Sequence, residues 1–180
     1  MPNHCSNILT CEDGDFKSVI REFLSYNDAN NMVHLDFDKI VPMPKELDIT
    51  ASFNPKDVEL QEQYKINLEK FGFQNWYDWR VENWGTKWNS YDCNMTDFGM
   101  SFCTAWSPPE PVIKELAKIT GKTFVLEYME EGEAFIGRYT ASPDEVIDEC
   151  YELPDGPQEL KDSFGWEPWE EEDEDLELTK

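Results

Sequence analysis

The stretch from residue 99 to residue 139 constrains the fold more than any other part of the chain. Apolar and polar residues alternate over Gly99–Trp106, which predicts a strand. Ser107-Pro108-Pro109-Glu110 comes directly after it. A Ser cap, a Pro at the first helical position and a Glu at the third are typical of a helix start. We therefore expect a strand that runs straight into a helix.

That helix is predicted to end at Gly121, since glycine readily adopts the left-handed conformation of a helix C-terminus. Its apolar positions are Val112, Ile113, Leu116 and Ile119. The segments Thr123–Tyr128 and Ala134–Tyr139 read as strands, and Glu130-Glu131-Gly132 between them indicates a hairpin. Ser142-Pro143-Asp144-Glu145 repeats the capping pattern, so a short helix is expected after it.

The first half of the chain supplies further elements. Cys5–Glu12 alternates and predicts a first strand, and residues 16–24 show helical spacing of apolar residues. His34–Val41 alternates again and predicts a second strand, which Pro42 stops. Asp57–Phe71 reads as a charged helix with an inner stripe of Val58, Tyr64, Leu68 and Phe71. It is expected to be an insertion between the second and third strands.

The order of these elements predicts an α+β fold. Without the insertion and the last hairpin strand, it is the βαββαβ pattern of the ferredoxin-like fold, an antiparallel sheet with helices on one face. We expect a domain over residues 1–153, with a helical, Trp-rich insertion at about 45–95 and an added C-terminal hairpin strand. Residues 154–180 are expected to be an acidic C-terminal extension.

Composition and charge narrow the function classes. Aromatic residues make up 14% of the 180 residues, too many for a disordered chain, so the core should be built on large rings. The net charge is −24, from 39 acids and 15 bases. Such a field repels nucleic-acid phosphates and anionic membranes, and it attracts basic proteins, including those with a basic nucleic-acid groove. Solubility alone is the competing explanation for the acidity.

Cysteine usage and apolar runs indicate a reducing, non-membrane setting. There are five cysteines and no CxxC pair, which argues against a disulfide framework and a thiolate metal cage. No apolar run reaches the roughly 20 residues that span a bilayer. The N-terminal residues lack the basic and apolar regions of a secretory signal. We therefore expect a cytoplasmic location.

Several stretches together resemble the YubB-like family over roughly residues 1–140. They are Met1–Asn7, Ile40–Pro44, Asn83–Asn89, Phe102–Pro109 and the strand around Phe135-Ile136-Gly137. Members of that family are similar to small proteins of bacteriophages and conjugative plasmids, so the resemblance implies an origin in a mobile element and a bacterial host cell. It also implies a ferredoxin-like domain, with no iron–sulfur cluster and no assigned activity.

The segment from Trp76 to Trp88 is the candidate binding site. Aromatic faces beside cations and amides can bind a planar ring or a peptide side chain. The candidate residues are Trp76, Trp79, Arg80, Asn83, Trp84, Lys87 and Trp88. The alternative is that these tryptophans line the core beneath the insertion.

No reactive set stands out in the sequence. His4, Cys5, Cys11 and His34 match no zinc-binding spacing, and Cys103 lies within an apolar strand, as an inert thiol would. Asp36 and Asp38 would share one face of the second strand, as solvated charges. No catalytic triad, phosphate-binding loop or dinucleotide turn is present. We expect no catalytic residues, no metal, no cofactor and no enzymatic activity.

The C-terminal stretch carries a block of six consecutive acids. They are Glu170, Glu171, Glu172, Asp173, Glu174 and Asp175. Blocks of this kind often act as interaction arms, and a solvating tail without a partner is the alternative.

Two functions follow. The first is a non-enzymatic mobile-element protein that binds a host protein through its acidic surface, as a counter-defence protein or DNA mimic. The second is a domain that binds a small ligand or nucleotide through Trp76–Trp88. The sequence leaves the oligomeric state open, and an exposed edge strand would allow a homo-oligomer.

Overall fold

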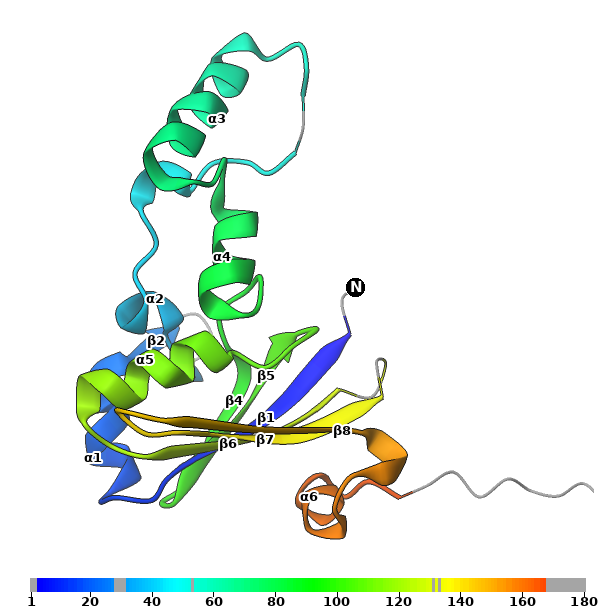
Figure 1. Cartoon of the computed structure of the whole chain (residues 1–180). Coiled ribbons are helices and arrows are strands. Elements are labelled where there is room, and N and C mark those ends of the chain that lie inside the picture. The colour runs from blue at the N-terminus through cyan, green and yellow to red at the C-terminus, as the bar shows by residue number, and fades with distance from the viewer. Residues whose placement is uncertain (1–2, 28–31, 53, 131, 133, 168–180) are drawn as a thin grey trace, which may run out of the picture.

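A six-stranded antiparallel sheet with helices packed on it forms the body of the chain (Figure 1). The computed structural model describes residues 3–27, 32–52, 54–130, 132 and 134–167. Neighbouring strands follow the order β4, β5, β1, β6, β7, β8. Their bounds are Tyr91–Met95 (β4), Gly99–Ala105 (β5), His4–Cys11 (β1), Phe124–Glu130 (β6), Phe135–Ala141 (β7) and Val146–Glu152 (β8).

The four strands β4, β5, β1 and β6 reproduce the ferredoxin-like arrangement. β1 lies between β5 and β6 and is antiparallel to both, and β4 pairs with the far side of β5. Helix α1 (Phe16–Ile20) follows β1, and α5 (Glu110–Thr120) connects β5 to β6. The expected α+β fold is therefore confirmed, with β7 and β8 added beyond β6.

The second strand of the sheet is not the one that the alternation predicted. Residues 34–41 divide between β3 (Met32–Leu35), which pairs only with β2 (Leu24–Asn27), and helix α2 (Phe37–Ile40). The predicted strand is wrong because the carboxylate of Asp36 accepts a hydrogen bond from the backbone N–H of Asp38 at 3.1 Å and caps α2. β4 takes the strand's place in the sheet.

Both predicted capping boxes are also wrong. Helix α5 begins at Glu110, and the Ser107 hydroxyl donates instead to the backbone carbonyl of Gly85. The Ser142 hydroxyl accepts from the N–H of Glu145 at 3.0 Å, but this bond closes a turn between β7 and β8. The β-branched residues after that turn continue as strand β8 rather than as a helix.

The main core lies between the helices and one face of the sheet. Apolar residues of β1, β5 and β6 meet α5, α1 and α2 there, with Leu9, Phe37 and Leu116 fully buried. Asn7 is the polar exception in the middle of β1. Its amide donates to the carbonyl of Cys5 at 2.8 Å and to the hydroxyl of Thr104 at 2.9 Å, so its burial is compensated.

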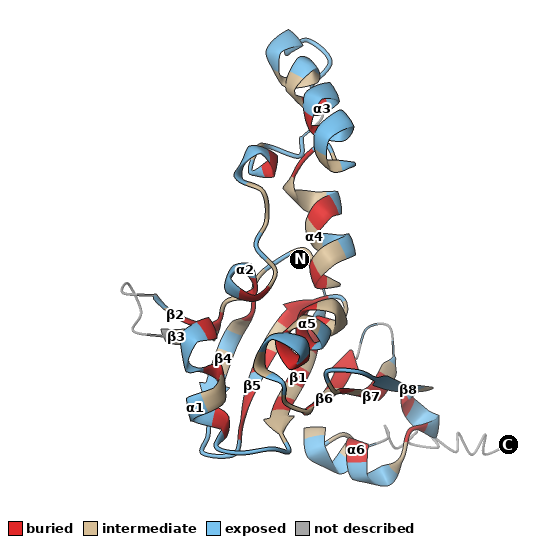
Figure 2. Cartoon of the chain, turned by 60° about the vertical axis from the view of Figure 1, so that its left-hand side comes forward, coloured by how far each residue is buried: buried red, intermediate tan, exposed pale blue. Residues whose placement is uncertain are grey.

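The insertion forms an arm that projects from the body. It contains a 3-10 turn at Lys45–Leu47, α3 (Val58–Phe71) and α4 (Trp76–Trp84). Figure 2 shows most of α3 as exposed. The predicted inner stripe of α3 holds only in part, because Tyr64 is buried while Val58 is 77% exposed. The helix is fixed by Asn67, whose buried amide donates to the carbonyls of Glu46 and Gln74 at 3.0 Å each.

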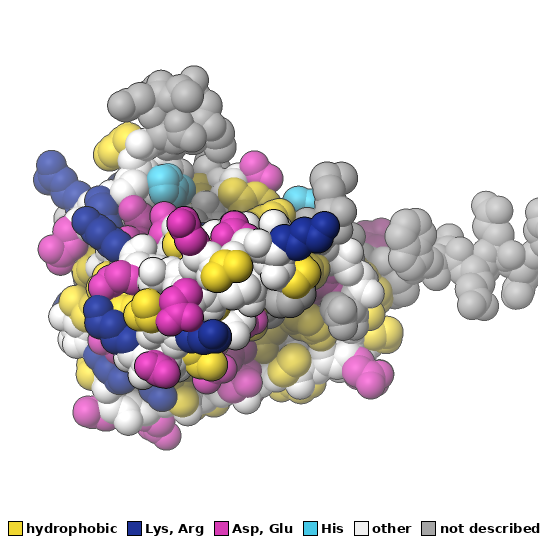
Figure 3. Space-filling view, turned by 90° about the horizontal axis from the view of Figure 1, so that it is seen from above, with side chains coloured by type: hydrophobic (Ala, Val, Ile, Leu, Met, Phe, Trp, Pro, Cys, Tyr) yellow, Lys and Arg dark blue, Asp and Glu magenta, His cyan; other side chains and the backbone are white. Residues whose placement is uncertain are grey.

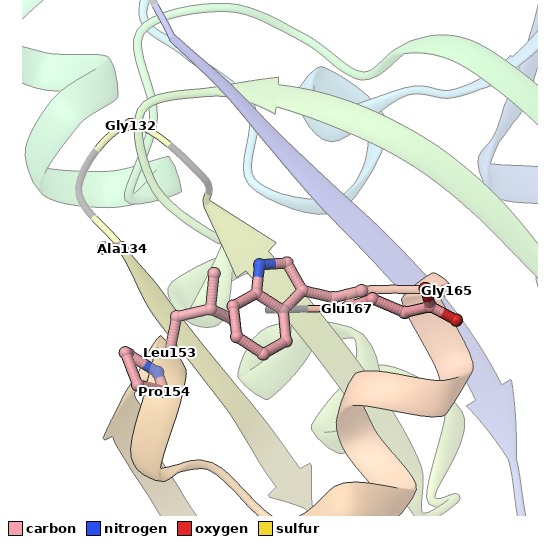
Figure 4. Close-up of a pocket in the computed structure, with 7 residues that line it drawn as sticks. Gly132, Ala134, Leu153, Pro154, Gly165 and Glu167 are labelled. Atoms are coloured by element: carbon pink, nitrogen blue, oxygen red, sulfur yellow. The ribbon is translucent and has the colours of Figure 1, made fainter. Parts of the chain in front are cut away.

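A second, smaller core lies on the opposite face of the sheet. The 3-10 turn Leu153–Asp155 and helix α6 (Gln158–Phe164) cover part of β6 and β7 there. Figure 4 shows the hollow of about 760 Å³ beside them, with Leu153 and Pro154 on one side and Gly165 and Glu167 on the other.

A further 3-10 turn, Arg21–Phe23, follows α1. Among the described residues, no helix is both long and apolar enough to cross a membrane.

Candidate functional site

Helix α4 presents the first half of the predicted site. The side chain of Asn75 caps the helix by accepting from the N–H of Tyr77 at 2.9 Å, and Gly85 ends it in the left-handed conformation. Glycine is required there because a Cβ would lie 2.9 Å from the carbonyl oxygen of Pro108. The spacing of four residues places Trp76, Arg80 and Trp84 along one side of the helix.

The guanidinium of Arg80 lies between two of these tryptophans. Its central carbon is 5.2 Å from the ring centroid of Trp76 and 4.7 Å from that of Trp84. Burial lowers the pKa of Arg80, although the charges of Asp48 and Asp38 act in the opposite direction. Within the described residues, the buried Nε of Arg80 has no hydrogen-bond partner.

A hollow of about 440 Å³ opens at this point, where the arm meets the body. Its lining combines both signs of charge with an aromatic ring and an amide: Asp38, Met43, Lys45, Asp48, Arg80, Trp84 and Asn89. The position suits a small ligand that carries a hydrogen-bond acceptor for Arg80.

The remaining α4 residues of the predicted site are structural. Trp79 and Trp84 are 8% and 1% exposed and meet edge to face, with ring centroids 6.0 Å apart. The indole N–H of Trp84 donates to the carbonyl of Val41 at 2.9 Å. The amide of Asn83 donates to the carbonyl of Trp79 within the same helix. Trp84 therefore anchors α4 to the body and also lines the hollow, whereas Trp79 packs against Trp84 and Asn83 bonds within its own helix.

Lys87 and Trp88 form a separate cluster with a residue that the sequence analysis did not single out. The ammonium of Lys87 lies 4.2 Å from the ring centroid of Trp88 and 3.9 Å from that of Trp106. The two indoles are 41% and 38% exposed. Trp88 also packs edge to face on Tyr91, whose hydroxyl is 2.9 Å from Nδ1 of His4. The structure thus divides the predicted site into an Arg80 cluster and a Lys87 cluster.

Strand β8 and its two ends carry a row of exposed carboxylates. We call this row the acidic strip, and it consists of Asp144, Glu145, Asp148, Glu149, Glu152 and Asp155. In the part of the chain that the structure describes, none of the six forms an ion pair with Lys, Arg or His.

The two basic side chains nearest in sequence to the acidic strip are already engaged. Arg138 on β7 binds Glu127 and Glu159, each at 2.9 Å. The ammonium of Lys161 donates to the carbonyl of Pro154 at 2.7 Å and lies 5.5 Å from the ring centroid of Trp166. Arg138 is also the register partner of Glu149 on β8, so it offsets part of the charge of that one carboxylate, while its ion pairs are made to Glu127 and Glu159.

The charge of the whole chain is divided unevenly. Residues 123–180 hold 20 of the 39 acids but 3 of the 15 bases, a net charge of −17, and residues 1–122 carry −7. Figure 3 looks down onto the end of the molecule that carries the arm, where basic and acidic side chains are interspersed. Within 123–167, the described residues alone hold 11 acids and 2 bases, so negative potential is concentrated on β6, β7, β8 and the segment that follows them.

A group of polar side chains lies where α5 meets β8. The hydroxyl of Tyr128 donates to Oδ1 of Asp148 at 3.1 Å. Burial, and then the charge of Asp148, raise the pKa of Glu110 to about 7. Burial, and then the charges of Glu110 and Asp148, raise the pKa of Tyr139 to about 12. Two carboxyl groups from distant parts of the sequence thus interact on the helix-bearing side of β8.

The histidines and cysteines form no site of their own. Across the described ranges, no group of three or more His, Cys, Asp and Glu side chains has the geometry to hold a metal ion. Burial raises the pKa of Cys103, which disfavours the thiolate. Asp36 was predicted to be a solvated charge, but its carboxylate accepts hydrogen bonds from the side chains of Ser25 and Asn89. Burial acts to raise the pKa of Asp36, and these hydrogen bonds lower it below its ordinary value.

The predicted acidic tail, residues 170–175, lies outside the described residues. The acidic strip was missed because its members were assigned to a capped helix, whereas they lie along a strand. The available signal was the pair of β-branched residues Val146-Ile147, which favours a strand.

Comparison with known proteins gives a family and one solved structure. Residues 83–177 match the family model described as "Ferredoxin-like domain in Api92-like protein". The crystal structure of a protein api92 from Yersinia pseudotuberculosis is similar with a TM-score of 0.46 and 8% sequence identity, over 87% of this chain and 100% of that one. No curated protein matches the sequence.

Proposed function

This chain belongs to the family of the ferredoxin-like domain in Api92-like protein, and from that premise we propose that it is a non-enzymatic accessory protein of a mobile element. In this proposal it acts in the cytoplasm of a bacterial host, as its resemblance to YubB-like phage and plasmid proteins implies. It binds a host protein with a basic groove through the acidic strip, and so competes with DNA for that groove.

The observation that carries the proposal is the largely uncompensated charge of the acidic strip. Six exposed carboxylates follow one strand and its ends, and among the described residues the ion pairs of Arg138, the register partner of Glu149, are made to Glu127 and Glu159 instead. A cationic groove would gain from meeting such a row, and electrostatic attraction would speed the encounter. Solubility alone requires no such segregation, since interspersed charges serve it equally well.

Purified basic DNA-binding proteins of the host provide the test. Calorimetric titration of the full chain should show saturable binding to at least one of them, and a DNA duplex should compete. Reversing Glu145, Glu149 and Glu152 to Lys should abolish this binding. Reversing the exposed arm residues Glu59, Glu62 and Glu69 to Lys changes the net charge equally and should leave most of it.

Salt separates this proposal from unspecific attraction. Binding through the acidic strip should weaken strongly between about 0.05 M and 0.5 M salt, because the Debye length shortens severalfold over that range. If both triple variants lose binding equally, net charge alone is responsible and the proposed role of the acidic strip is wrong.

A second candidate function rests on Arg80. Arg80 lines the hollow of about 440 Å³, and its guanidinium would donate hydrogen bonds to an anionic or carbonyl group of a small ligand or nucleotide. Thermal-shift screening against nucleotides and metabolites tests this, since a ligand at a hundred times its dissociation constant adds about 2.7 kcal/mol of stability. A true ligand should lose its shift with Arg80→Met and keep it with Lys87→Met.

A further inference from the structure

The outer edge of β8 is open along its full length. β8 pairs with β7 over all seven of its residues, and among the described elements no strand lies beyond it. Every residue of β8 except Tyr151 is exposed, including Ile147 at 52%. Figure 1 shows β8 at the outside of the sheet. The backbone groups that point away from β7 are therefore available for pairing.

The two edges of the sheet differ in regularity. At the opposite edge, β4 has a shift of register between Tyr91 and Asn94, and Asp92 there has φ of 50°. Such a bulge interferes with further pairing. The ladder between β8 and β7 has no shift from Val146 to Glu152. Of the two edges, β8 is the one shaped to accept another strand.

Charge decides what kind of strand can pair there. Within β8, Asp148, Glu149 and Glu152 are acidic and no residue is basic. In the centred antiparallel register, a second copy of β8 would place Glu149 opposite Glu149 and bring Asp148 diagonal to Asp148 and Glu152 of the other copy, and like charges across a strand pair are destabilising. An extended segment rich in Lys or Arg would instead form opposite-charge pairs along the ladder.

The alternation of β8 supplies contacts on both sides of an added strand. Asp148 lies on the side that carries α5, because it accepts from Tyr128 of the main core. Glu149, its neighbour, lies on the other side. The charge of Asp148 also acts on the half-buried carboxyl of Glu110 at the start of α5, whose pKa is raised by burial and then by Asp148. A cationic side chain of the added strand would relieve the repulsion between these two carboxyls.

We propose that β8 accepts an extended, Lys- or Arg-rich segment of a partner protein as a seventh strand, with one cationic side chain beside Asp148. The inference rests on the proposed function, since it specifies how the acidic strip binds its partner. In addition to the attraction between charges, backbone hydrogen bonds would join β8 to the partner segment. These bonds would favour extended segments over other basic surfaces.

Synthetic peptides test the two parts separately. The probe is a fluorescein-labelled peptide of alternating Lys and Val, measured by anisotropy against the full chain. One comparison peptide has the same sequence with every second amide N-methylated, which blocks one edge of its backbone. Another replaces Lys with Glu. The alternating Lys peptide should bind at least about tenfold more tightly than either.

Variants locate the site. Glu149→Lys with Glu152→Lys should weaken binding of the Lys peptide by about tenfold or more, whereas Glu59→Lys with Glu62→Lys should change it little. In hydrogen-exchange NMR, bound peptide should slow the exchange of outward-facing β8 amides. It should also lower the pKa of Glu110, which carbon-detected titration of its carboxyl can follow.

The outcomes separate this inference from the proposed function. If the Lys peptide and its N-methylated form bind equally, and β8 amides stay unprotected, the acidic strip binds cations without adding a strand and only the inference is overturned. If the β8 substitutions leave peptide binding unchanged, the peptide binds elsewhere, and both the inference and the proposed function are wrong. If sedimentation shows dimers that the β8 substitutions disrupt, the occupant is a second copy and the inference is wrong.

Discussion

The side chain of Tyr128 crosses strand β7 and donates its hydroxyl to Oδ1 of Asp148 on β8 at 3.1 Å. It can do so because Gly137, its register partner on β7, has no side chain in the way. A Cβ at that glycine would lie 2.4 Å from Cζ of the tyrosine. This crossing connects the main core to the edge strand that carries the acidic strip.

Gly137→Ala should therefore destabilise the fold. The added methyl group would also lie 2.6 Å from the carbonyl oxygen of Glu149, which is backbone and cannot easily move. We expect the free energy of unfolding, measured by urea denaturation, to fall by about 1–3 kcal/mol.

Tyr128→Phe is the matched control, because it removes only the hydroxyl. It should cost about 1 kcal/mol, the usual net value of a hydrogen bond. A loss with Gly137→Ala no larger than that of Tyr128→Phe would contradict the close approach seen in the structure.

Stability should decline as pH rises from about 5 to 8. The folded-state pKa of Glu110 is raised to about 7, above its ordinary value of 4.5, by burial and then by the charge of Asp148. Between these two values the folded state binds more protons than the unfolded state, so raising the pH favours unfolding. Urea denaturation at several pH values measures the slope, and Glu110→Gln should flatten it. An unchanged slope in that variant would exclude Glu110 as the titrating group.

The arm should unfold locally when Asn67 is replaced by Leu. The carbonyls of Glu46 and Gln74 would lose their donor, which costs about 1–3 kcal/mol for each buried group left unsatisfied. Hydrogen exchange of α3 amides should accelerate, while β1 amides, paired on both sides, should keep their protection. Equal acceleration in α3 and β1 would mean that the arm and the body unfold as one unit.

Lys87→Met should lower stability by about 1 kcal/mol, because the ammonium lies against two indole faces. Methionine keeps the apolar stem, so packing is largely conserved. Lys65→Met removes the same charge from an exposed ion pair and should cost close to nothing. The two values come from parallel urea denaturation, and equal losses would show that net charge, rather than the indole contacts, is responsible.

Local patterns predicted the elements whose residues face one core. The strands β5, β6 and β7 are rich in apolar and aromatic residues and bounded by turn residues, and α5 has a regular apolar stripe, so this part of the fold was predicted from the sequence. β4 was missed because it has only five residues and lies just after the Trp-rich segment, although Tyr91–Met95 does alternate. α2 was taken for a strand because a four-residue helix is too short to show its period.

The candidate sites were harder to predict because they combine distant residues. Neighbouring Trp and Arg residues pointed to α4, but only folding brings Trp106 onto Lys87, and Glu110 beside Asp148. The burial of Trp84 depends on Phe37, from another helix. Sequence spacing carries no information about such pairs.

The central place of β1 has a consequence for synthesis on the ribosome. Its two neighbours are β5 and β6, so Cys5 cannot form its strand pairs until the ribosome has synthesised Thr104 for one side and Glu130 for the other. At a translation rate of about 5–20 residues per second, that delay lasts roughly 6–25 s. During this time the strand is a nascent segment with unsatisfied backbone, and ribosome-associated chaperones are its natural protection until the last strands emerge from the exit tunnel.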